Sequence, residues 1–225
     1  MRFLLNIFLC FAMYLIVAGV NAAPVRRLYQ DVKLPTQQMI EKFSITNPAA
    51  AGTTQILNAS NGPTSAAAAN VTTFVAQPDV PRNLVITPGG TTADVAACTV
   101  TVTGTNYFGT TITEDFVFAE NASSATTGAK AFKTVSKIAF PANCEDSPWS
   151  ATWDVGYGEK LGLNRCMDYA GHFVFSTVAG SYESTRATVA ADATHVESNT
   201  ADFNGTMNGS NDFEAFFIQN FRCFP

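Results

Sequence analysis

The sequence has little charge and almost no histidine. Charged residues make up 14% of the 225 residues, with 13 basic residues, 18 acidic residues and 2 histidines. A net charge of −5 argues against a nucleic-acid-binding domain, because such domains normally carry a basic patch that neutralises phosphates. Two histidines without a repeated cysteine or histidine spacing argue against a zinc site. We therefore expect no nucleic-acid partner, no metal and no cofactor.

The first 22 residues have the layout of a secretory signal peptide. Arg2 supplies a positive charge, an apolar run extends from Phe3 to Val20, and cleavage is expected after Ala22. An uncleaved membrane anchor is the alternative, because the run approaches the ~20 residues that span a bilayer. We expect an exported chain without a membrane contact after cleavage.

Cysteine usage agrees with export. The leader contains Cys10, and an even number of cysteines remains after it, compatible with two disulfides in an oxidising compartment. Four cysteines allow three pairings, and sequence alone does not choose among them; four buried thiols are the alternative. The candidate disulfide cysteines are Cys98, Cys144, Cys166 and Cys223.

The chain also contains tripeptides that accept N-linked glycans in a eukaryotic secretory pathway. In a chain rich in Asn, Ser and Thr such tripeptides also arise by chance, and in either case they indicate surface positions. The candidate acceptors are Asn58, Asn70, Asn121, Asn204 and Asn208.

The mature chain divides into an N-terminal arm, residues 23–44, and one domain, residues 45–225. In the arm, Pro35 followed by Gln37–Phe43 predicts a short helix. In the domain, Cys98–Thr103 alternates apolar and hydroxyl residues, which is typical of a strand with one buried face. Thr111–Phe118 predicts the returning strand after a turn.

Further strand patterns separated by short turns predict an all-β fold, an antiparallel β-sandwich of the Ig-like or jelly-roll-like type. The 18 phenylalanines are enough for a continuous core. The other expected strands are Asn83–Thr87, Ser136–Phe140, Ala151–Val155, His172–Val178, Thr185–Ala190 and Glu214–Ile218.

The turn-rich segment Asn199–Asn211 contains two Asn-Gly pairs, which favour tight hairpin turns. It is a candidate interaction loop, because exposed loops on a rigid scaffold commonly bind partners. A plain hairpin connection is the alternative. The residues we single out in it are Asn199, Phe203, Asn204, Gly205, Asn208 and Gly209.

No motif predicts catalysis. Gly156 and Gly158 lack the spacing of a phosphate-binding loop and instead predict a strand that leads into a turn. His172 and His195 lack the context of a nucleophilic triad. The acidic residues do not follow a calcium-loop pattern. Aromatic residues such as Trp149, Trp153 and Tyr157 would form either a ligand platform or part of the core.

Five blocks of this sequence, taken in order, resemble a family of tailed-bacteriophage structural proteins. The resemblance covers about residues 45–220, and it implies an all-β component of a phage particle without catalytic residues. Its partners would be copies of itself or other virion proteins. The blocks are Pro78–Gly90, Thr99–Phe118, Gly128–Ala142, Asp154–Leu163 and His195–Ile218.

Three functions follow from these observations. The first is a non-enzymatic virion structural protein, a capsid decoration or tail-associated module acting through protein contacts. The second is a secreted, disulfide-bonded binding or adhesion module for a surface receptor or glycan. The third and least favoured is a secreted hydrolase. The resemblance predicts a virion location and the leader predicts secretion, and the two conflict because phage proteins assemble where thiols stay reduced.

Overall fold

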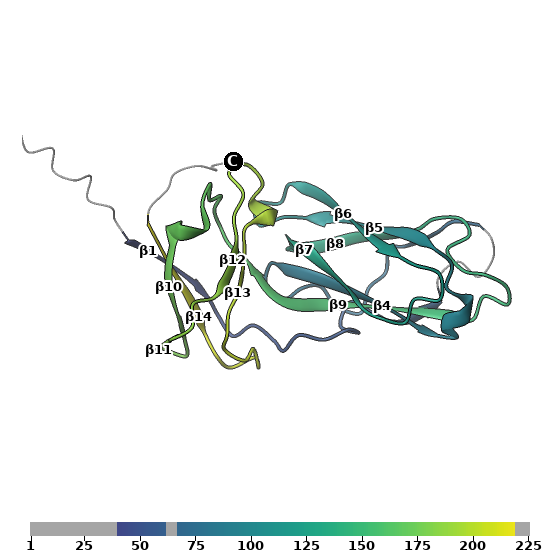
Figure 1. Ribbon diagram of the computed structural model, residues 1–225, viewed down its shortest axis with the longest axis horizontal. Helices are drawn as coiled ribbons and strands as arrows, with labels where there is room; N and C mark the ends of the chain where they lie inside the picture. The colour runs from purple at the N-terminus through teal and green to yellow at the C-terminus, as the bar shows by residue number, and fades with distance from the viewer. Residues whose placement is uncertain (1–39, 62–66, 219–225) are drawn as a thin grey trace, which may run out of the picture. The chain divides into compact units, whose positions relative to one another are not determined.

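The computed structural model describes residues 40–61 and 67–218, and these form antiparallel β-sheets with three short 3₁₀ turns (Figure 1). The predicted all-β, antiparallel class is confirmed. The elements are β1 (Ile40–Ile45), β2 (Leu57–Asn61), β3 (Ala69–Val71), β4 (Arg82–Gly90), η1 (Thr92–Asp94), β5 (Cys98–Thr105), β6 (Thr111–Phe118), β7 (Thr126–Phe132), β8 (Thr134–Phe140), β9 (Ala151–Gly162), η2 (Ala170–His172), β10 (Phe173–Val178), β11 (Ser181–Tyr182), β12 (Thr188–Ala190), η3 (Val196–Ser198), β13 (Thr200–Asp202) and β14 (Phe213–Ile218).

The strands form three sheets. The central sheet has the order β12-β13-β9-β4-β7, with β2 paired to β9. The sheet with the order β3-β8-β5-β6 is called the β5 sheet, and the sheet with the order β1-β14-β10-β11 is called the β14 sheet. Every strand pair is antiparallel.

The predicted helix over Gln37–Phe43 is wrong where the structure describes it. Ile40–Ile45 is strand β1, paired with β14 from Ile40 opposite Ile218 to Ile45 opposite Phe213. A helix this short is marginal in water, whereas the strand gains a full ladder of hydrogen bonds and buries Ile45. Residues 37–39 and the predicted leader lie outside the described residues.

The first core lies between the central sheet and the β5 sheet. In β5 the predicted alternation holds, because Val100 and Val102 are fully buried while Thr99 is exposed. Burial of such apolar side chains is the main stabilising contribution, about 25 cal/mol per Å². The first core includes Leu84, Ile86, Trp153 and Val155 from the central sheet and Val100, Val102, Phe116 and Phe140 from the β5 sheet.

The second core lies beneath the β14 sheet, and the long strand β9 contributes to both cores. Trp153 near its start packs in the first core, and Leu161 near its end packs in the second. The predicted turn after Val155 is therefore wrong, because the strand continues to Gly162. The second core includes Leu161, Leu163, Phe173, Phe203, Met207, Phe213 and Phe217.

At two sheet edges, side chains form hydrogen bonds with backbone groups that an added strand would otherwise pair with. Gln77 donates from Nε2 to the carbonyl of Val135 at 3.1 Å and accepts from its N–H at 2.6 Å, in the manner of a neighbouring strand. The Glu114 carboxylate on β6 accepts from the N–H groups of Ala129 at 2.6 Å and Lys130 at 3.1 Å on β7. These hydrogen bonds prevent another strand from pairing with β8 at Val135 or with β7 at Ala129 and Lys130.

Cys98 and Cys144 form a disulfide, with Cα atoms 5.2 Å apart. Cys166 is also disulfide-bonded and fully buried, and Cys223 lies outside the described residues. Within residues 40–61 and 67–218, no helix has the length and apolar character needed to cross a membrane.

Candidate functional site

The five candidate glycan acceptors are all exposed. Asn121 has a left-handed backbone with φ 58° in the turn after β6. Asn204 donates from Nδ2 to the carbonyl of Thr185 at 2.7 Å, and the Asn208 side chain accepts from the N–H of Ser210 at 2.9 Å. The structure therefore places every one of these positions at the surface, as glycan attachment requires.

The candidate interaction loop divides into an exposed and a buried part. Asn199 is fully buried, and its side chain accepts from the N–H groups of Met167 and Asp192 and donates to the carbonyls of Asp192 and His195. Phe203 packs in the second core. Asn204, Asn208 and Gly209 are exposed, and Gly205 is half-buried. Asn199, Phe203 and the buried Met207 thus hold the segment in place, and the residues on either side of Met207 carry its accessible surface.

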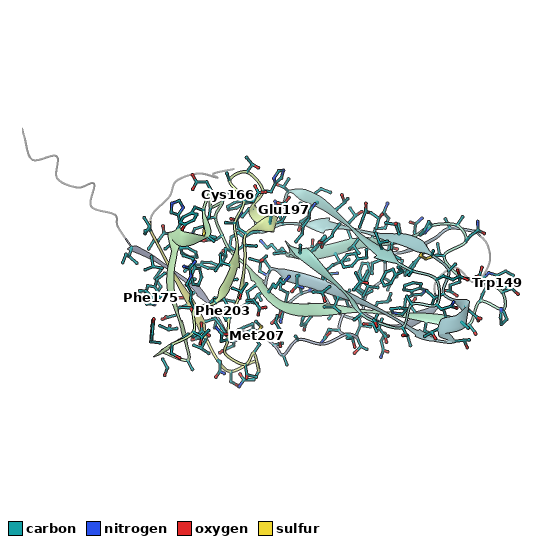
Figure 2. All side chains as sticks on the ribbon, in the orientation of Figure 1. Trp149, Cys166, Phe175, Glu197, Phe203 and Met207 are labelled. Carbon is teal, nitrogen blue, oxygen red and sulfur yellow. A yellow bond between two sulfur atoms is a disulfide. The ribbon has the colours of Figure 1, made fainter. Side chains whose placement is uncertain are left out.

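The aromatic residues do not form a common platform. Trp153 is fully buried and donates from Nε1 to Glu145 Oε1 at 2.8 Å. Trp149 is 36% exposed, and it lies in the segment between β8 and β9 (Figure 2). Trp153 therefore stabilises the core, where its ring meets Phe118 at a centroid distance of 5.1 Å.

Each histidine lies beside one aspartate. His172 Nδ1 is 3.2 Å from Asp168 Oδ1, and His195 Nδ1 is 3.2 Å from Asp192 Oδ1. The N–H groups of Thr194 and His195 donate to the Asp192 carboxylate and lower its pKa to about 2. Among the described residues, no group of three or more His, Cys, Asp or Glu side chains is arranged to hold a metal ion.

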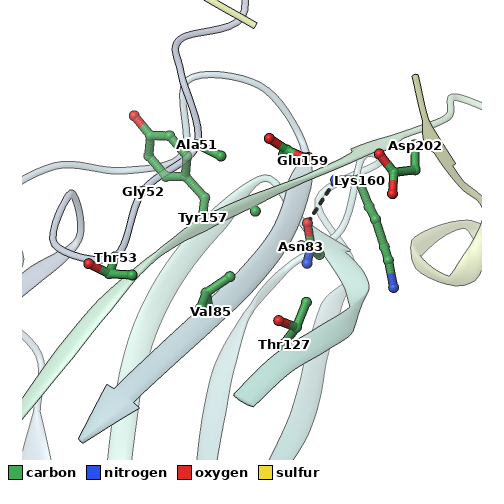
Figure 3. A pocket seen from close by; sticks show the side chains of 11 residues that line it. Ala51, Gly52, Thr53, Asn83, Val85, Thr127, Tyr157, Glu159, Lys160 and Asp202 are labelled. Carbon is green, nitrogen blue, oxygen red and sulfur yellow. Dashed lines mark hydrogen bonds between the residues drawn. The ribbon is translucent and has the colours of Figure 1, made fainter. Parts of the chain in front are cut away.

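The candidate site is a pocket of about 370 Å³ beside the central sheet (Figure 3). Strands β4, β7, β9 and β13 and the segment before β2 supply its walls. Sequence patterns did not indicate it, because its residues are far apart in the chain. The pocket is lined by Ala51, Gly52, Thr53, Asn83, Val85, Thr127, Tyr157, Gly158, Glu159, Lys160 and Asp202.

Two glycines in β9 make this geometry possible. A Cβ atom at Gly156 would lie 2.2 Å from the carbonyl oxygen of Gly52, and one at Gly158 would lie 2.6 Å from the Asn83 amide. Glycine inside a strand commonly marks such a close approach. The alternating glycines in the sequence are the signal that would have indicated this packing.

Asn83 is fully buried at the base of the pocket and is held at both ends of its amide. Its Nδ2 donates to the carbonyl of Gly128 at 3.1 Å, and its Oδ1 accepts from the N–H of Lys160 at 3.0 Å. Asn83 thus ties β4 to β7 and β9 at the base of the pocket.

The charged residues of the pocket are Glu159, Lys160 and Asp202. Asp202 lies directly opposite Lys160 in the β13–β9 register, and in Figure 3 the lysine side chain extends away from the aspartate. Within the part of the chain that the structure describes, the carboxylates of Glu159 and Asp202 and the ammonium of Lys160 have no ion pair or side-chain hydrogen bond. These groups are therefore available to a ligand.

Two ionisable groups near the pocket have raised pKa values. Burial raises the pKa of Tyr157, with Asp79 adding to the effect and Arg82 opposing it. Burial also raises the pKa of the Glu114 carboxyl, although the N–H groups of Ala129 and Lys130 oppose the shift. Both shifts favour the neutral form of the side chain.

Comparison of the chain with protein-family models, with curated proteins and with solved structures finds no match. Its function is therefore inferred from the residues and geometry alone. The pocket combines donors and acceptors, and its lining contains no histidine, cysteine or serine. Chemically, this arrangement suits recognition of a small polar group.

Proposed function

We propose that the chain is an exported, non-enzymatic β-sandwich module that is stabilised by disulfides and acts by binding. The sandwich assignment is supported by the first core, to which the central sheet and the β5 sheet both contribute buried side chains. A layered β-scaffold of this kind leaves pockets and loops free for a partner. The binding role is supported by the pocket beside Asn83, which is lined by the charged side chains of Glu159, Lys160 and Asp202.

The observation that carries the proposal is the pairing of cysteines behind a leader-like N-terminus. Cys98 and Cys144 are bonded, and Cys166 is bonded as well. Disulfides persist in secreted proteins and are rare in the cytosol, where thiols are kept reduced. Export therefore accounts for the leader pattern and for the bonded cysteines together.

The test is an intact mass and a non-reducing peptide map of the protein from its native source. Export predicts a chain that begins at Ala23 and a peptide pair joined through Cys98 and Cys144. A chain that retains Met1 and carries free thiols at both cysteines overturns the proposal. Glycan masses on peptides containing the five exposed acceptors would add that the source is a eukaryotic secretory pathway.

A second candidate is a virion structural module that assembles with copies of itself, as the resemblance implies. The outer face of the β14 sheet favours it, because Ile40 is 57% exposed and Tyr182 is 68% exposed. Between them the rings of Phe175 and Phe216 are stacked with centroids 4.2 Å apart. Exposed apolar patches of this kind mark protein contacts.

Self-association is tested by measuring the molar mass in solution by light scattering. Assembly predicts a multiple of the single-chain mass, and the double variant Ile40→Ser, Tyr182→Ser reduces it to one chain. Val117→Ser is the matched control, because Val117 is 70% exposed on the β5 sheet instead. A wild-type protein with the mass of one chain at about 100 µM contradicts assembly through this face.

A further inference from the structure

We propose that the pocket beside Asn83 binds a neutral sugar ring, either free or at the end of a glycan. The inference rests on the proposed binding function and specifies its ligand. The pocket volume of about 370 Å³ lies within the range of small-molecule sites, roughly 300–1,000 Å³. It accommodates one ring with its hydroxyl groups and leaves the remainder of a glycan outside.

The polar groups of the pocket match the chemistry of a polyol. Each sugar hydroxyl both donates and accepts, so it needs acceptors and donors side by side. Asp202 offers only acceptors and Lys160 only donors, and these two residues occupy opposite positions on neighbouring strands. Because the lysine side chain extends away from the aspartate, hydroxyls at different positions on one ring can donate to Asp202 and accept from Lys160, as charge-assisted hydrogen bonds.

The charge of the pocket disfavours anionic ligands. Glu159 and Asp202 bring two carboxylates, and Lys160 brings one ammonium. The carboxylates outnumber the ammonium, so a ligand with a full negative charge is repelled. A neutral ligand with several hydroxyls can use acceptors and a donor without this repulsion.

The backbone around the site is also preorganised. Asn83 is held by hydrogen bonds to the carbonyl of Gly128 and the N–H of Lys160 before any ligand arrives. Gly52 is fixed over β9 by donation from its N–H to the carbonyl of Tyr157 at 3.1 Å. Groups already held in place lose little conformational freedom on binding, which favours recognition of a small ligand.

The experiment uses full-length, oxidised, isotope-labelled protein whose Cys98–Cys144 bond has been verified by mass. It is titrated with glucose, galactose, mannose and N-acetylglucosamine, with glycine and sulfate as zwitterionic and anionic probes, and backbone amide shifts are followed by NMR. At least one neutral sugar should shift the amide signals of Gly158 and Lys160. Lys160→Met and Asp202→Asn should each weaken that binding about tenfold or more.

Lys137→Met is the matched control, because Lys137 is an exposed lysine on β8 in the β5 sheet. It should leave the sugar affinity unchanged. Three results overturn the inference: no sugar shifts these amides, both pocket variants retain full affinity, or glycine or sulfate binds in place of the sugars. Any of these, in protein with the verified disulfide, leaves the export proposal standing, whereas an unprocessed chain with free thiols overturns that proposal instead.

Discussion

The Arg82 guanidinium carbon lies 4.4 Å from the centre of the Tyr157 ring, and Arg82 has no exposed surface. The guanidinium donates to the carbonyl of Gly158 from Nε at 2.9 Å and from Nη2 at 2.6 Å, and to the carbonyl of Ala49 at 3.0 Å. Nη2 also lies 3.2 Å from Met207 Sδ. Because Tyr157 belongs to the first core and Met207 to the second, Arg82 joins the two cores.

Replacing Arg82 should therefore destabilise the whole domain. Arg82→Met leaves the carbonyl of Gly158 buried without its donors and Asp79 without the ion pair at 3.0 Å, and we expect a loss of about 3 kcal/mol. Arg82→Lys should also be destabilising, because an ammonium lacks the planar fork. Urea denaturation measures the free energy of unfolding. Lys137→Met, at an exposed position, is the control. Equal free energies of unfolding for the Arg82 and Lys137 variants would show that Arg82 does not join the two cores energetically.

Strands with strict alternation could be predicted from the sequence. Thr111–Phe118 is strand β6 with the expected bounds, and its buried residues Ile112, Phe116 and Phe118 all lie on the face toward the first core. The strand β7, Thr126–Phe132, was missed because Gly128 and two alanines give it no alternating pattern. Propensity favoured a helix near Ile40, but the pairing with β14 decided the conformation there.

The pocket could not be predicted because it depends on which strands become neighbours. Asn83, Thr127, Lys160 and Asp202 come from four strands, and register alone brings them together. Asp202 lay in a segment that the sequence assigned to a turn-rich loop, whereas the structure pairs it in β13. Local patterns show which residues alternate, but long-range pairing decides which of them meet.

The close approach at Gly156 gives a second prediction. Gly156→Ala places a Cβ atom 2.2 Å from the Gly52 oxygen and 2.7 Å from the carbonyl carbon of Thr53, so backbone must move. We expect a loss of about 2 kcal/mol in the free energy of unfolding. Gly109→Ala is the comparison, because it has φ +85° and open space, and its cost is the left-handed backbone alone, about 1 kcal/mol. A smaller effect at Gly156 than at Gly109 would contradict this account.

Removing the Cys98–Cys144 bond should lower the free energy of unfolding, because the unfolded chain gains conformational entropy without the cross-link. The cysteines are 46 residues apart, and closing a loop of that length reduces the entropy of the unfolded chain by the equivalent of about 4 kcal/mol. The double variant Cys98→Ala, Cys144→Ala should lose about this amount in urea denaturation under non-reducing conditions. Reduction of the parent protein should produce at least the same loss. A double variant as stable as its parent would mean that the bond does not constrain the chain.

The raised pKa of the Glu114 carboxyl leads us to expect a specific dependence of the free energy of unfolding on pH. Its pKa is raised above 4.5 in the folded protein, chiefly because the group is buried. As the pH rises through 4.5, the carboxyl therefore ionises in the unfolded chain before it does so in the folded protein. The unfolded state then binds fewer protons, and the free energy of unfolding falls as the pH rises until the folded pKa is passed.

Glu114→Gln tests this directly, because the amide oxygen can still accept from Ala129 and Lys130 but the group does not titrate. Its free energy of unfolding should fall less than that of the wild type between pH ~4 and ~7, measured by urea denaturation at intervals. The hydrogen bonds to β7 are retained, so the difference isolates the ionisation of the buried carboxyl. Parallel pH profiles for the two proteins would show that burial of Glu114 does not contribute to the slope.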